Sequence, residues 1–102
     1  MSANPVRGEV ALPLTSGVRL LRPSFSALVA AEAEAGSLFQ LLDRAAGGQA
    51  RIADIGALFW HCLGDRRDAE ERQQFETALL AEGVGALLPV YRALLSAVFG
   101  GR

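Results

Sequence analysis

The sequence predicts an α+β protein that is mostly α, with an N-terminal β-hairpin followed by four to five short helices in one compact domain. Two patterns predict this class. Apolar residues alternate with other residues within residues 9–21, as they do along a half-buried strand. After Pro23 the apolar residues recur every three or four positions, and Gly or Ser residues interrupt this helical spacing. The length of 102 residues fits a single domain, residues 1–102.

The hairpin is expected at about residues 9–21. Val10, Leu12 and Leu14 share one face of its first strand. The loop at residues 15–17 ends in a glycine, which readily adopts the left-handed conformation that a three-residue hairpin loop requires. Because a lone hairpin is only marginally stable in water, its apolar face predicts helices packed across it.

Helical segments follow the hairpin, and most of them have a local start or stop signal. Ser24 or Ser26 caps the first segment, Ser37 caps the second, and Asp68 caps the fourth. Glycines follow the segments, as expected at helix ends. The predicted ranges are about 24–35, 38–46, 52–63, 69–82 and 86–99. Pro89 should lie near the first turn of the last segment, where its missing N–H matters little.

Composition excludes several classes of protein and partner. The chain is 51% apolar with a net charge of −1, which argues against a disordered tail and against a basic surface for nucleic acid. The single cysteine, Cys62, cannot form an internal disulfide and fits a reducing compartment. Residues 1–8 lack a signal-peptide core, and the apolar stretch 84–100 is too short to span a membrane. We therefore expect a cytoplasmic protein that binds neither nucleic acid nor membranes.

No pattern of residues indicates an active site, so we expect no enzymatic activity, no metal and no cofactor. His61 and Cys62 are adjacent, but neighbouring residues on a helix point in different directions. Cys62 shares the apolar side of its helix with Ile52 and should be buried and inert. His61 falls on the opposite side beside Asp54, where the two form at most an exposed pair. One His and one Cys cannot complete a zinc site.

The last helix carries more apolar surface than a helix at a protein surface needs. Its apolar residues, among them Tyr91, Leu94 and Val98, cover about half of its circumference. The interpretation that we favour is a central helix buried by the other elements. The alternative is that part of its apolar arc is a docking surface. Trp60, beside the apolar side of the third helix, is either a second docking residue or part of the core edge.

Glu32 breaks the pattern of the first helix, because it shares a face with the apolar residues Phe25 and Val29. A buried carboxylate needs a partner, so we expect Glu32 to reach solvent or to pair with an arginine such as Arg19 or Arg51. The functional alternative is a polar anchor at a partner groove. The candidate partner-binding residues are therefore Glu32, Trp60, Tyr91, Leu94 and Val98.

Several segments, taken together in their order and spacing, resemble a known protein family. They are Asn4–Val10 before the hairpin, Leu21–Phe25, Ala31–Leu38, and Leu58–Leu63 with the Leu-rich C-terminal part. This combination is similar to the small gene transfer agent proteins of alphaproteobacterial prophage-like clusters. The resemblance covers nearly the whole chain, and none of its motifs is catalytic.

The resemblance implies a phage tail assembly chaperone. Such a protein keeps the long, apolar tape-measure protein soluble while the tail tube polymerises around it. The family has also been labelled a tail tube protein, and a tube or connector subunit is the alternative function. We disfavour a tube subunit, because tube subunits stack through extended β-sheets and this sequence supplies one short hairpin. The expected partner is the tape-measure or another tail protein, and a homodimer would cover an exposed apolar helix.

Overall fold

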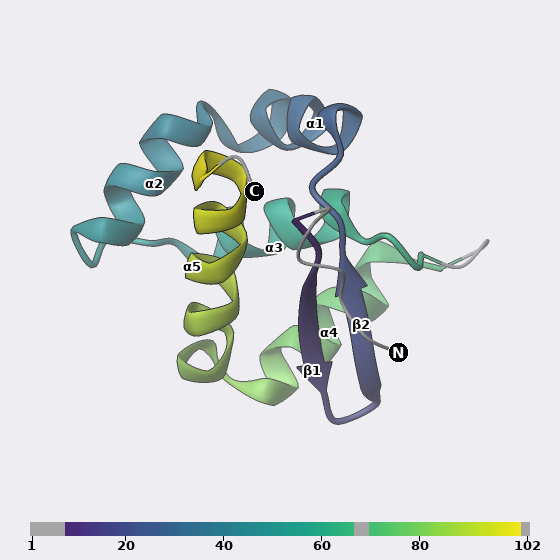
Figure 1. Ribbon diagram of the computed structural model, residues 1–102. Helices are drawn as coiled ribbons and strands as arrows, with labels where there is room; N and C mark the ends of the chain where they lie inside the picture. The colour runs from purple at the N-terminus through teal and green to yellow at the C-terminus, as the bar shows by residue number, and fades with distance from the viewer. Residues whose placement is uncertain (1–7, 67–69, 101–102) are drawn as a thin grey trace.

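The hairpin and five helices form in the predicted order (Figure 1). The computed structural model describes residues 8–66 and 70–100 of the chain. The elements are β1 (Val10–Leu14), β2 (Gly17–Leu21), α1 (Phe25–Ala35), α2 (Leu38–Ala46), α3 (Ile52–Cys62), α4 (Arg72–Glu82) and α5 (Val84–Gly100). The predicted α+β class, mostly α, is confirmed.

β1 and β2 form an antiparallel pair with one face toward the core. Val10 lies opposite Leu21, and Leu14 lies opposite Gly17. Gly17 was expected in the loop but already belongs to β2, and its φ of 131° is one that glycine adopts without strain. Two residues therefore connect the strands. Leu12 and Leu14 are buried, as the alternating pattern of the first strand predicts. In β2 the inward face holds Arg19 and Leu21, whereas Val18 is 50% exposed.

The end of α3 is joined to β2 by backbone hydrogen bonds. The N–H of Arg22 donates to the carbonyl of Cys62 at 2.6 Å, and the N–H of Gly64 donates to the carbonyl of Leu20 at 2.9 Å. Gly64 fits here because it has no side chain; an added Cβ would lie 3.1 Å from the Cβ of Arg22. These bonds fix the position of the hairpin relative to the helices.

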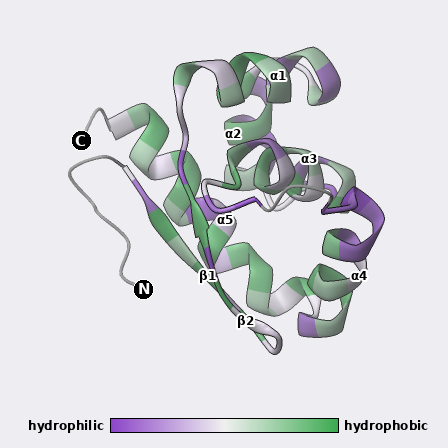
Figure 2. Cartoon of the chain, turned by 90° about the vertical axis from the view of Figure 1, so that its right-hand side faces the viewer, coloured by the Kyte–Doolittle hydropathy of each residue, from purple (hydrophilic) through white to green (hydrophobic). Residues whose placement is uncertain are grey.

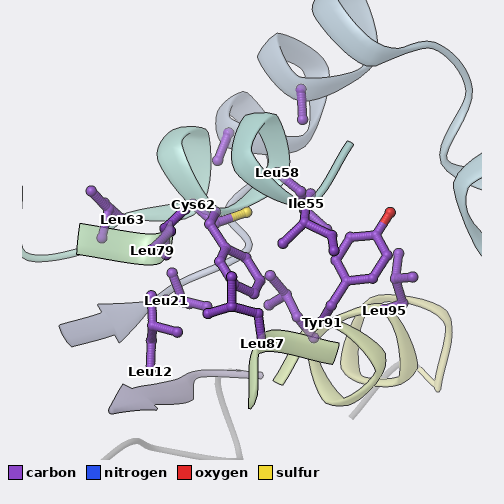
Figure 3. Packing of buried hydrophobic residues seen from close by; sticks show 14 of the residues in the cluster. Leu12, Leu21, Ile55, Leu58, Cys62, Leu63, Leu79, Leu87, Tyr91 and Leu95 are labelled. Atoms are coloured by element: carbon purple, nitrogen blue, oxygen red, sulfur yellow. The ribbon is translucent and has the colours of Figure 1, made fainter. Parts of the chain in front are cut away.

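α3 lies at the centre of the molecule. α1 packs against it more extensively than any other helix does, and α4 and α5 contact it as well (Figure 1). Every residue of 54–59 is buried. Ile55, Leu58 and Cys62 point from α3 into the cluster that also holds leucines of the hairpin and side chains of α5 (Figure 3). The main core thus forms around this helix.

α1 turns its alanines toward the core rather than its larger apolar residues. Ala27 and Ala31 are buried, whereas Phe25 is 85% exposed and Val29 is 50% exposed. The predicted apolar face is therefore wrong for Phe25 and Val29, whereas Leu28 of the same predicted face is partly buried against the core. The small side chains of the two alanines let the backbones of α1 and α3 approach closely, which leaves Phe25 and Val29 facing outward.

α4 begins later than predicted and α5 begins earlier. α4 starts at Arg72, and the predicted cap, Asp68, lies outside the described residues. α5 starts at Val84, directly after Gly83, whose φ is 86°. The two helices are bent by 111° at this break. Because α5 starts early, Pro89 lies inside the helix and not in its first turn, where it leaves one helical carbonyl without its usual hydrogen bond.

α5 packs one face into the core, while its polar stripe with Arg92 and Ser96 is exposed. Leu87, Tyr91, Leu94 and Leu95 are at most 1% exposed. The ring of Tyr91 packs edge-on against Phe59 of α3, with 6.2 Å between the ring centroids. The apolar excess of α5 is therefore largely used within the protein's own core.

Leu94→Ala should lower the free energy of unfolding by about 2–5 kcal/mol, because it leaves a cavity at a fully buried site. Urea unfolding followed by circular dichroism measures this loss. Leu80→Ala is the matched control; this side chain is 65% exposed, and its truncation should change stability by no more than about 0.5 kcal/mol. Equal losses in the two variants would contradict the assignment of Leu94 to the core.

Candidate functional site

An apolar groove lies between α3 and α4. Ile52, Ala53 and Gly56 of α3 form one wall, and Leu79 and Leu80 of α4 form the other. The groove has a volume of about 400 Å³. Ile52 is 48% exposed and Leu80 is 65% exposed, so their apolar surface is available to a partner. In Figure 2, α4 is hydrophilic at its start and carries hydrophobic residues in its later turns.

Gly56 forms the floor of the groove. The residue is buried, yet a Cβ added to it would have no heavy atom within 4 Å. These two facts together describe a narrow recess in the surface of α3. A glycine in a helix interior is unfavourable relative to alanine, so Gly56 lowers the stability of α3.

Three charged residues, Glu34, Arg72 and Glu76, also line the groove, and His61 joins them in an ion-paired cluster. Arg72 donates from Nη1 to Glu34 Oε1 at 2.7 Å and from Nε to Glu76 Oε2 at 3.0 Å. His61 Nε2 lies 2.8 Å from the same oxygen of Glu34. The hydrogen bonds from Arg72 hold the pKa of Glu34 at about 2, well below its ordinary value. The cluster links α1, α3 and α4 at the surface.

The predicted proximity of His61 and Asp54 is not found. His61 pairs with Glu34, whereas Asp54 is 1% exposed and lies among Arg44 and Arg51. Both Nε atoms donate to Asp54 Oδ2, at 3.1 Å from Arg44 and 3.2 Å from Arg51. Burial alone would raise the pKa of Asp54, but the hydrogen bonds from Arg51 and Arg44 outweigh it and leave the pKa lowered. Asp54 is therefore a buried structural anion rather than half of an exposed pair.

The five candidate partner-binding residues do not gather on one surface. Tyr91 and Leu94 are fully buried in the core, and Val98 is partly buried. Trp60 is also partly buried, with its ring 5.9 Å from that of Phe75 and the guanidinium of Arg66 4.6 Å from its ring centroid. Because these two side chains cover it, Trp60 lies at the edge of the core, which was the alternative to its being a docking residue.

Glu32 reaches the surface, as expected, but pairs with neither predicted arginine. It accepts a hydrogen bond from the N–H of Leu38 at 2.9 Å and so caps the start of α2. Arg19 instead binds Asp65 and Glu70, and Arg51 binds Asp54. Glu32 lies on the outward side of α1 and is absent from the lining of the α3–α4 groove.

The sequence reasoning missed the residues that form the groove. Ile52 was assigned to the buried side of its helix, yet it lies at the first position of α3 and is half exposed. Leu79 and Leu80 are adjacent, and neighbours on one helix cannot both face the core. The adjacent leucines, together with Gly56 inside a helix, were signals that could have located the groove.

The described residues hold no arrangement for metal or thiol chemistry. Cys62 is buried as predicted, and burial raises the pKa of its thiol to about 12, which keeps it protonated. Within residues 8–66 and 70–100, no group of three or more His, Cys, Asp or Glu side chains could hold a metal ion. None of the helices in this part of the chain is by itself long and apolar enough to cross a membrane.

Residues 7–101 match the model of one protein family, described as phage tail tube protein, GTA-gp10. The chain belongs to this family. Membership confirms the resemblance to small gene transfer agent tail proteins. No curated protein and no solved structure matches the chain.

The gene transfer agent family places the protein among tail proteins of phages and phage-like particles. Family membership implies that the protein interacts with other tail proteins. The α3–α4 groove exposes two large apolar side chains, Ile52 and Leu80, to solvent.

Glu34→Gln should reduce the dependence of stability on acidic pH. The pKa of Glu34 is about 2 in the folded protein and 4.5 ordinarily, so its charged form stabilises the fold above pH 4.5 and this effect is lost as the pH falls toward 2. The variant should be less stable than wild type at pH 7 and approach it near pH 2. Urea unfolding across this pH range tests the expectation, and parallel pH profiles for the two proteins would contradict it.

Gly56→Ala should raise the free energy of unfolding by about 0.5–1 kcal/mol, because alanine favours the helix and its Cβ meets open space. Gly64→Ala is the control, since its Cβ would lie 3.1 Å from that of Arg22 and should bring no gain. Thermal unfolding of both variants provides the comparison. A destabilised Gly56→Ala would mean that the recess is filled.

Proposed function

We propose that this protein is a tail assembly chaperone, which binds the tape-measure protein during tail assembly and performs no enzymatic reaction. The observation that supports this most directly is the apolar groove with exposed Ile52 and Leu80 on a small helical member of a tail family. A tape-measure protein is long and apolar, and it needs cover before the tube encloses it. Binding would take place in the cytoplasm, without a cofactor.

The proposed mechanism is reversible burial of an apolar client segment. A chaperone must release its client when the tube polymerises, so moderate affinity is an advantage. A single groove of about 400 Å³ is small compared with the surface that stable protein complexes bury. A limited contact of this kind favours repeated binding and release over permanent assembly.

A structural subunit of the tail, either tube or connector, is the second candidate function, because the matching family is described as a tail tube protein. The described residues contain one sheet of two strands, whereas tube subunits stack through extended β-sheets. This difference favours the chaperone. A subunit would occur in many copies in purified particles, and a chaperone would be scarce there or absent.

Co-expression with the tape-measure protein tests the proposal. We expect the tape-measure protein to stay soluble and to co-purify with the tagged chain, because its apolar segments are covered. Mass spectrometry of finished particles should then find little of the chain. Expression of the tape-measure protein alone is the control. A tape-measure protein that remains insoluble, with abundant chain in particles, would favour the structural subunit.

A further inference from the structure

We infer that the α3–α4 groove holds one amphipathic helical segment of the tape-measure protein, with an apolar side chain over Gly56 and a basic side chain beside Glu34 and Glu76. The inference rests on the proposed function and names the surface and the client chemistry. Three properties of the groove carry it: its length, the nature of its walls and the charged residues that line it.

The groove has the length of a short helical segment. Its α4 wall contains Arg72, Glu76, Leu79 and Leu80, which recur at the spacing of one helix face. Eight steps along a helix cover about 12 Å, or roughly two turns. A client helix lying along this wall would place two successive apolar side chains in the groove, with one of them over Gly56.

The walls favour a helix over an extended segment. Ile52, Ala53 and Gly56 belong to α3, and Leu79 and Leu80 belong to α4, so the groove runs between the sides of two helices, whose backbone groups bond within each helix. An extended segment would find no strand edge here and would bury unpaired backbone groups. A helix satisfies its own backbone and presents only side chains, which is the helix-in-groove mode of recognition.

The charged residues of the groove favour a basic side chain on the client. The lining includes two carboxylates, Glu34 and Glu76, and one guanidinium, Arg72. The side chain of Glu76 is 47% exposed, so it remains accessible beside its bond to Arg72. A Lys or Arg at the end of an apolar client segment would complement this excess of negative charge.

Two groove variants and one matched control test the inference in co-expression with the tape-measure protein. Gly56→Leu fills the recess at a position where an added Cβ meets no atom. Leu80→Asp places a charge on the apolar wall at a side chain exposed enough to tolerate it. Phe25→Asp introduces the same charge at another exposed apolar residue, on α1 and outside the groove. Thermal unfolding identifies any variant that fails to fold.

Co-expression with wild type and with Phe25→Asp should yield equal amounts of soluble tape-measure protein. Co-expression with either groove variant should reduce this amount at least roughly tenfold, as expected when the centre of an interface is blocked. Undiminished recovery by folded groove variants would overturn the groove assignment while leaving the chaperone function intact. If the wild-type protein itself does not keep the tape-measure protein soluble, the proposed function is overturned. If the protein alone forms a dimer and Gly56→Leu converts it to a monomer, the groove binds a second copy of the chain. That result would overturn the assignment of the groove to the tape-measure protein.

Discussion

The burial of α3 is the constraint on which the rest of the structure depends. Residues 54–59 are buried without interruption, so this helix needs cover on every side and not only along one stripe. α1 covers it through alanines, α5 through Tyr91 and neighbouring leucines, and the hairpin is bonded to its C-terminal end. The positions of these elements therefore follow from the surface of α3 that each of them buries.

Burying residues 54–59 of α3 creates an electrostatic difficulty at Asp54. An uncompensated carboxylate in the core would be strongly unfavourable. Arg44 from α2 and Arg51 from the preceding loop donate to its oxygens and keep it charged, as its lowered pKa shows. The same bonds tie α2 to the central helix. Asp54, which the sequence analysis placed in an exposed pair, thus attaches α2 to α3.

The positions of the elements could be predicted from the sequence better than the direction in which each faces. Ser24 and Ser37 mark helix starts by local hydrogen bonds, and Gly36 and Gly83 mark helix ends, so these boundaries depend on nearby residues alone. Which side of α1 faces inward depends on how closely α3 approaches, and this distance is a property of the whole fold. The outward orientation of Phe25 and the burial of Asp54 were missed for this reason.

The same reasoning explains why the residues of α5 that were predicted to bind a partner lie apart from the groove. The apolar excess of α5 is conspicuous in the sequence, but Tyr91 and Leu94 are used to cover α3 and have no surface left for a partner. The groove in which we propose that a partner binds lies instead where the neighbours of α3 leave a recess, at Gly56 beside Leu80. A side chain at position 56 would partly fill this recess and remove the space that a client helix needs. Gly56 thus lowers the stability of α3 and leaves the groove open, which suits the transient binding that we propose for it.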